Sequence, residues 1–364
     1  MRDVWRAALW GLHAAYEGVH PNQDVDGHPD ARSGQDICGG FFLVPWILKG
    51  DLDYFAKGLH LCHYSSNSFC EHCAAFAGDN VDWRWNNFRS DARWMLHSYT
   101  TPEWRAKHPN LHWLFVKFPF LNQHNVEGDE LHIVFLGVVQ CTLGSVLWLL
   151  CHRCLPGRPA DNLAEVWAFI ADFYRSHHTS TQVSNLRLSQ FEPRDGTPYP
   201  KLKGKAAEAK DLVEPVLAAW EHFRNDDTYE YEQVRRMLTS QFEAQNHISD
   251  HGSDICLPPG QARSYFKSVL DFLQSYSILA NKADSDGDRL WSMTPKFHWY
   301  YHLAQRAKYL SPRVSACWRD EAFVGHIKHI VSSAVNGTSM EQVPCVVADK
   351  MRWAIHFMDM DIVE

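Results

Sequence analysis

A long apolar stretch covers residues 133–151 and is interrupted only by Gln140, Thr142, Ser145 and small residues. Its length is close to the ~20 residues that a membrane-spanning helix needs. A helix buried on all sides in a large core has the same composition. Aromatic residues make up 13% of the 364-residue chain, including 15 Trp, and large rings favour a substantial core. We therefore expect a buried helix and no stable membrane association.

The remaining patterns predict a helix-rich α/β chain with a little sheet near its start. Residues 41–48 and 111–120 are strand-like apolar runs, the first followed by Gly50. Helical spacing covers most of the rest. The connection 184–204 is the best boundary, separating residues 1–183 from a helical region over 205–364. The expected helices lie at 3–18, 83–104, 163–176, 205–223, 229–243, 260–280, 296–309, 318–333 and 341–358.

The formal net charge of -8 excludes a surface that is basic throughout, so any contact with nucleic acid must come from a local patch. The best candidate is a lysine group within or just after the connection. Lysine runs are usually solvated faces, and a solvated loop that leads into a surface helix is the favoured alternative. The candidates are Lys201, Lys203, Lys205 and Lys210, with Arg194 just before them.

Cysteines and histidines suggest a zinc site. No apolar secretory segment follows Met1, so a reduced intracellular compartment fits the ten cysteines best. In Cys70-x-x-Cys73 the spacing lets two thiolates meet one Zn²⁺. His63 is one candidate for a further ligand. His97 and His108 are others, and two buried free thiols are the equal alternative.

Two C-terminal patterns carry further candidate ligands. His298 and His302 are four residues apart, the spacing of a metal pair on one helical face, but their aromatic neighbours favour histidines in a core or an interface. Glu321, Gly325 and Lys328 also share a helical face. A carboxylate and a cation placed in this way could bind metal and phosphate together, and a surface ion pair is the alternative.

Read in order, several motifs resemble the catalytic region of eukaryotic CACTA-type (En/Spm-like) DNA transposases. The strand-like run that ends Gly50-Asp51 resembles the family's strand with its aspartate. The segment 70–73 resembles the family's C-x-x-C element, and Asp129-Glu130-Leu131-His132 resembles its Asp-x-x-His motif at the start of an apolar helix. Segments 295–298 and 317–328 resemble the C-terminal part. The similarity covers residues from about 40 to about 330.

The resemblance implies a ribonuclease-H-like core with large helical insertions and a zinc knuckle. It implies that Asp51 is the second acid of a catalytic triad and Glu321 the third, with Asp129 and His132 as an accessory motif. Such acids hold two Mg²⁺ or Mn²⁺ ions for phosphodiester transfer. DNA would be the partner and the nucleus the location, and homo-oligomerisation stays open. Alone, Gly-Asp is more often simple turn chemistry, and Asp53 is an alternative strand-end acid.

The departure from the family concerns its first acid, which lies on an earlier strand. The acidic residues upstream of Asp51 do not end an apolar run, so the opening strands are expected to be missing. Loss of one catalytic acid usually lowers the rate by orders of magnitude. The alternative function is therefore a non-catalytic, zinc-binding transposase remnant that binds DNA or protein. The upstream acids are Asp24, Asp26, Asp30 and Asp36.

Overall fold

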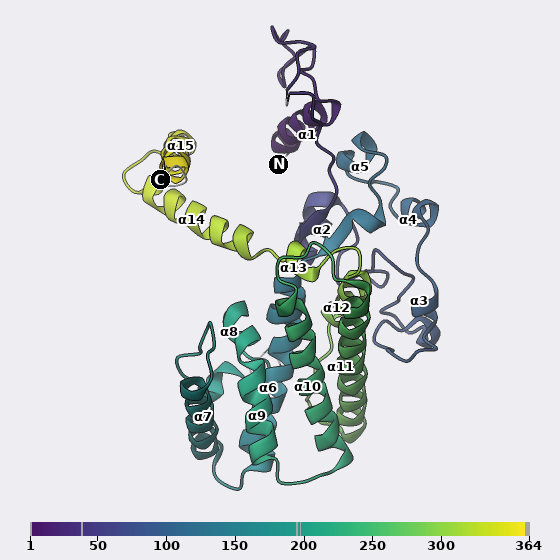
Figure 1. Cartoon of the computed structure of the whole chain (residues 1–364), viewed down its shortest axis with the longest axis vertical. Helices are drawn as coiled ribbons and strands as arrows, with labels where there is room; N and C mark the ends of the chain where they lie inside the picture. Colours follow the sequence, from purple (N-terminus) through teal and green to yellow (C-terminus); the bar gives the residue numbers. More distant parts are fainter. Residues whose placement is uncertain (1, 38, 194–195, 197, 361–364) are drawn as a thin grey trace. The chain divides into compact units, whose positions relative to one another are not determined.

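The computed structural model describes residues 2–37, 39–193, 196 and 198–360. The chain forms two compact units, Met1–Ala316 and Cys317–Glu364. The first unit is built mainly of helices (Figure 1). In chain order its elements are α1 (Arg2–Glu17), β1 (Leu48–Gly50), α2 (Leu52–Leu59), η1 (Val81–Trp83), α3 (Arg93–Leu96), α4 (Thr101–Lys107), α5 (Trp113–Lys117), η2 (Gln123–Asn125), β2 (Val126–Gly128), η3 (Leu131–Val139), α6 (Gln140–Leu149), η4 (Leu150–Cys154), α7 (Pro159–Ser176), η5 (Leu188–Gln190), α8 (Ala206–Asp211), α9 (Val213–Phe223), α10 (Tyr229–Asp250), α11 (Pro259–Asp286), α12 (Pro295–Arg306) and α13 (Pro312–Ser315).

The apolar stretch forms one continuous helix, Leu131–Cys154, made of η3, α6 and η4. It is long and apolar enough to cross a membrane, but 89% of its most apolar window is buried inside the protein. The structure therefore places this stretch as a core helix, as the composition led us to expect. η3 and η4 are wound as π-helix, which is uncommon over more than a single turn.

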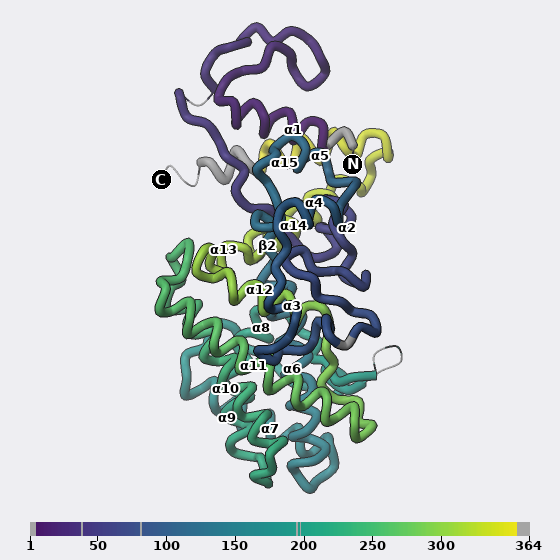
Figure 2. The backbone as a smooth tube through the Cα atoms, turned by 90° about the vertical axis from the view of Figure 1, so that its right-hand side faces the viewer, coloured from purple at the N-terminus to yellow at the C-terminus, as the bar shows by residue number. Residues whose placement is uncertain are grey.

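Long amphipathic helices enclose this core helix. α10 packs along α11, α9 packs on both α6 and α10, and α12 packs on η3 and α11. Figure 2 shows α9, α10 and α11 side by side from a second direction. Large side chains such as Trp220, Tyr276 and Phe272 are fully buried between these helices. Burying side chains of this kind stabilises the fold by roughly 1.5–3 kcal/mol each.

The sheet of the described residues has two parallel strands, β1 and β2. Gly50 pairs with Gly128 in register, and each strand ends at that glycine. The strand predicted over residues 41–48 forms only at its end, and residues 42–47 have no regular structure. The strand predicted over 111–120 is wrong. Trp113–Lys117 is the short helix α5, and His112 caps it by accepting from the backbone N–H of Leu114.

Helix α12 lies against β2 and runs in the opposite direction. Arg306, near its C-terminal end, donates to Glu127 Oε2 at 2.7 Å. Trp299 stands over Gly128, where an added Cβ would lie 3.1 Å from the indole. The same indole also packs near Phe55 of α2, with ring centroids 6.2 Å apart. Helix α12 therefore ties the end of β2 to α2.

The second unit consists of α14 (Trp318–Val335) and α15 (Val343–Met360), which pack on each other. The connection 184–204 lies within the first unit, where the backbone N–H groups of Lys201 and Leu202 bond to Phe191 and Gln140 carbonyl oxygens. The helix-rich α/β prediction is confirmed in this form.

Candidate functional site

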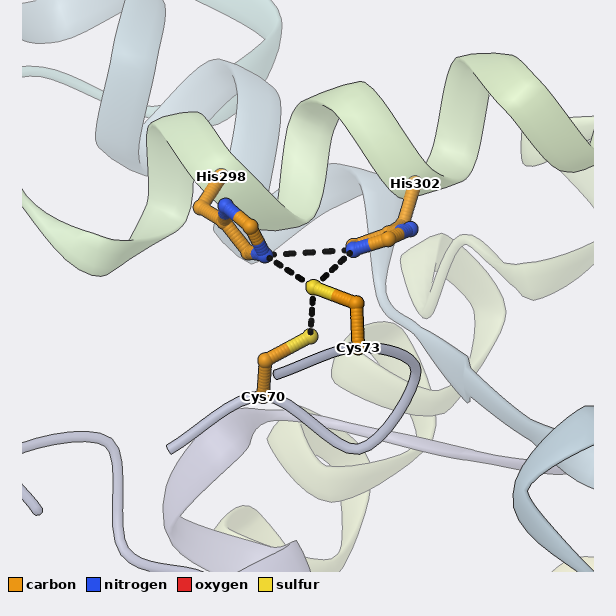
Figure 3. A group of neighbouring side chains, drawn as sticks. All are labelled: Cys70, Cys73, His298 and His302. Carbon is orange, nitrogen blue, oxygen red and sulfur yellow. Dashed lines mark hydrogen bonds between the residues drawn. The ribbon is translucent and has the colours of Figure 1, made fainter. Parts of the chain in front are cut away.

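Four metal-ligand side chains from distant parts of the chain meet in the first unit. Cys70 and Cys73 lie on the loop after α2, and His298 and His302 lie one turn apart on α12 (Figure 3). Cys73 Sγ is 3.6 Å from Cys70 Sγ, 3.3 Å from His298 Nε2 and 3.4 Å from His302 Nε2. The two Nε2 atoms are 3.1 Å apart.

These distances match a tetrahedral metal site. With Zn–S bonds near 2.3 Å and Zn–N bonds near 2.0–2.1 Å, tetrahedral geometry places ligand atoms about 3.8 Å apart for S–S, about 3.6 Å for S–N and about 3.3 Å for N–N. The observed distances follow the same order and are each slightly shorter. The four residues, which we name the Cys₂His₂ cluster, could therefore hold a metal ion with two thiolates and two imidazoles.

The surroundings of the Cys₂His₂ cluster orient its ligands. His298 Nδ1 donates to the Trp85 carbonyl oxygen at 3.1 Å, and His302 Nδ1 approaches Gln305 Oε1 at 3.3 Å. Each bond fixes the tautomer that presents Nε2 to the centre. Trp94 packs against the His298 ring, with centroids 4.3 Å apart. All four ligand residues are at most 3% exposed. A closed, dry site of this kind is structural in character.

Electrostatics in the cluster favour the metal-binding forms of Cys70 and His298 but not that of Cys73. Burial alone would raise the pKa of Cys70, but the hydrogen bond from Cys73 and the nearby His302 and His298 hold that pKa well below its ordinary value. Burial and the neighbouring Cys70 raise the pKa of Cys73. Burial lowers the pKa of His298, which favours the neutral imidazole that binds metal.

His63 lies outside this cluster. Its Nδ1 is 2.6 Å from Ser65 Oγ, and its ring faces Asp53 at 3.9 Å. His97 pairs with Glu103 instead. The i, i+4 spacing of His298 and His302 was the only sequence signal for the missing ligands, and their aromatic neighbours argued against it.

Glu71, inside the C-x-x-C loop, braces that loop. Its Oε2 accepts from Trp104 Nε1 and His108 Nε2, both at 2.7 Å, and its Oε1 accepts from the Cys62 backbone N–H. Cys62, Glu71 and His108 form a second convergent group of ligand-type atoms among the described residues. The three donors already satisfy the Glu71 carboxylate, which indicates a structural role.

The strand ends carry the predicted acids. Asp51 follows β1 and Asp129 follows β2. Because Gly50 pairs with Gly128, the two aspartates follow neighbouring strands at the same level. Paired strands lie about 4.8 Å apart. Asp51 caps α2 by accepting from the Tyr54 N–H at 2.6 Å. Asp53 lies one residue inside α2 and pairs with Lys57 at 2.7 Å, so the strand-end acid is Asp51.

Asp129 is fully buried, and its carboxylate holds His132. One oxygen accepts from the Leu131 N–H at 2.9 Å, and the other makes a short hydrogen bond with His132 Nδ1. With Nδ1 turned to Asp129, a neutral imidazole presents Nε2 as its acceptor. The His132 side chain is 25% exposed, so the ring reaches the surface. We name Asp51, Asp129 and His132 the acid edge.

A lysine accompanies the acid edge. Lys296, in the first turn of α12, lies along the core helix at Gly137, where an added Cβ would overlap its Cδ. Burial and the nearby Lys201 lower the pKa of Lys296, whereas Cys141, Asp51 and Asp129 act in the opposite direction. The sequence offered no role for Lys296.

The remaining candidates are exposed. Lys201, Lys203 and Lys205 line the surface of the connection that docks on Gln140. Glu321 and Lys328 lie on α14 of the second unit, both exposed. Arg194 lies outside the described residues.

Comparisons with protein-family models, curated proteins and solved structures found no match to this chain. The chemistry of the site is therefore inferred from its own residues.

Proposed function

We propose that this protein is transposase-derived and acts on DNA phosphodiesters at the acid edge with Mg²⁺ or Mn²⁺. In the same proposal, the Cys₂His₂ cluster holds a structural Zn²⁺. The resemblance to CACTA-type transposases motivates the proposal. The in-register pairing of Gly50 with Gly128, which sets Asp51 beside Asp129, is the single observation that carries it.

The Asp51 carboxylate suits a hard divalent cation, because carboxylate oxygens are the ligands that Mg²⁺ and Mn²⁺ prefer. His132 Nε2 would add a nitrogen ligand from the end of β2. Asp129 would act behind His132 by orienting its ring. When bound, such a cation stabilises the charge that develops on a phosphodiester. Two ions on either side of a phosphate need ligands that are farther apart than those of a single-metal site. The ends of two neighbouring strands suit this better than a compact four-ligand cluster does.

The zinc assignment rests on the completeness of the ligand set. Four protein ligands close the tetrahedron and leave no position for a substrate. The Zn²⁺ would therefore hold the C-x-x-C loop against α12 and take no part in the chemistry. Glu321 stays a prediction from the resemblance as a third acid on α14.

Cleavage of supercoiled plasmid in Mn²⁺ tests the proposal. We expect the zinc-loaded protein to nick plasmid and Asp51→Asn to lose at least ~100-fold of that activity, since loss of a catalytic group usually lowers the rate by orders of magnitude. Asn is as good an N-cap as Asp, so this variant keeps the α2 cap and removes only the charge. Asp53→Asn is the matched control and should nick normally. Equal nicking by wild type and Asp51→Asn would overturn the assignment.

A second candidate is DNA binding without cleavage. The full burial of Asp129 and its engagement with His132 favour it, because this carboxylate faces a histidine rather than solvent. DNA binding in the absence of any Mn²⁺-dependent nicking would support this second candidate and exclude the first.

A further inference from the structure

Two lysines from different segments lie along the core helix. Lys296 lies across Gly137, and the backbone of Lys201 lies against Gly144, where an added Cβ would be 2.6 Å from Lys201 Cα. The two glycines are seven residues apart, which is about two helical turns and roughly 10 Å along the axis. Because both positions carry no side chain, the two lysine segments can lie directly against the helix.

Neither lysine segment is free to move away. The loop with Lys201 is fixed by the Leu202 N–H bonding to the Gln140 carbonyl oxygen at 2.9 Å and by Gln140 Nε2 donating to the Gly204 carbonyl oxygen at 2.9 Å. Lys296 is fixed at the start of α12, whose other end is anchored through Arg306 to Glu127. The fold therefore holds both lysine segments on the core helix, and the positive charge of Lys201 helps to lower the pKa of Lys296.

Charge counting shows what this arrangement attracts. Asp51 and Asp129 together carry two negative charges, which one divalent cation would cancel. Lys296 and Lys201 then leave a net positive charge beside the acid edge. A partly buried ammonium is weakly screened by salt, so the attraction for an anion is stronger here than at an open surface.

We infer that Lys296 and Lys201 form a phosphate-binding pair that holds a backbone phosphate of a nucleic acid beside the acid edge. The identity of the phosphate's carrier rests on the function proposed above. The exposed ammonium of Lys201 would make the outer contact, and the partly buried Lys296 the contact nearer Asp51 and Asp129. Lysine binds phosphate as a point charge, so the pair would fix position without reading base sequence.

The test is binding of a short fluorescein-labelled DNA duplex to the zinc-loaded full chain in the presence of Ca²⁺. Fluorescence anisotropy measures the binding at several salt concentrations. We expect Lys296→Gln and Lys201→Gln each to weaken binding roughly tenfold and to lower the salt slope by about one. Lys296→Arg should keep most of the affinity. Gly137→Ala should weaken binding without changing charge, because its Cβ displaces the Lys296 side chain.

Lys282→Gln on α11 is the matched control and should bind within about twofold of wild type, because Lys282 is paired with Asp286 away from both glycines. Thermal melting of every variant separates lost binding from lost folding. If wild type binds DNA and a folded Lys296→Gln binds equally well, the lysine pair is overturned and the proposed function stands.

Inorganic pyrophosphate, titrated by calorimetry, separates the two proposals further. Binding of pyrophosphate that depends on both lysines, without binding of DNA, would support the phosphate-binding pair and overturn the function on DNA. Failure to bind either probe would overturn both.

Discussion

Cys73 Sγ lies 3.3 Å from Nε2 of His298, a residue 225 positions later in the chain. This contact joins the loop after α2 to the first half of α12. Because Asp51 caps the start of α2 and Lys296 lies in the first turn of α12, a metal at this point would cross-link the two segments that carry these residues. A metal in the Cys₂His₂ cluster would therefore fix the position of these two segments relative to each other.

Replacing His298 with alanine should remove zinc. Removing a residue that only supports a metal ligand costs 10–100-fold in affinity, so removing the ligand itself should cost more than ~100-fold. Metal analysis of purified protein should find one equivalent of zinc in wild type and little in His298→Ala. His63→Ala is the control and should keep its zinc, since His63 lies on Ser65 and Asp53. Zinc lost from His63→Ala and kept in His298→Ala would contradict the ligand assignment.

Arg306→Met should destabilise the fold strongly. The variant leaves Glu127, which is 2% exposed, without its ion-pair partner, and breaking a buried pair in this way costs about 3–5 kcal/mol. Urea unfolding measures the loss. Arg158→Met removes an exposed pair with Asp161 and should cost less than about 1 kcal/mol. Equal losses in the two variants would show that α12 is not anchored through Arg306.

Glu130 should make stability depend on pH. Burial raises its pKa from 4.5 to about 7, so the folded state binds this proton more tightly than the unfolded chain does. Its stabilising contribution is complete below pH 4.5 and is lost as pH rises through about 7. From pH 4.5 to pH 8, Glu130→Gln should therefore gain stability relative to wild type, by up to about 3 kcal/mol.

Urea unfolding at several pH values measures the difference in free energy of unfolding between Glu130→Gln and wild type. Glu165→Gln, which replaces an exposed carboxyl on α7, is the control, and its difference from wild type should stay constant with pH. If the difference for Glu130→Gln is also constant with pH, a buried, protonated Glu130 is ruled out.

Local composition predicted the core helix well. Residues 133–151 are so apolar that they favour a helix buried on all sides, and the length of the apolar run predicted the length of that helix. The strand predicted at 111–120 is wrong because Leu114 and Phe115 are buried from a short helix, α5, that is capped by His112. For a short apolar run, periodicity does not separate a strand from a helix.

Of the Cys₂His₂ cluster, only the two cysteines could be predicted as ligands from the sequence. The C-x-x-C spacing marks Cys70 and Cys73 as a local pair, because both ligands come from one turn of chain. Their partners depend on how α12 packs, which no local pattern encodes. The aromatic neighbours of His298 and His302 suggested a plain core, yet Trp299 packs on the sheet while the histidines turn to the cysteines. The position of Lys296 could not be predicted either, since it depends on how α12 packs against Gly137 of the core helix.

The most direct measurement is Mn²⁺ binding to the zinc-loaded protein, with free Mn²⁺ quantified by its electron paramagnetic resonance signal. If the acid edge holds a divalent cation, Asp51→Asn should bind Mn²⁺ at least ~10-fold more weakly than wild type, because it loses a charged oxygen ligand. Asp53→Asn should bind within about twofold of wild type, since an exposed charge contributes little. Equal Mn²⁺ affinity in wild type and Asp51→Asn would contradict the account.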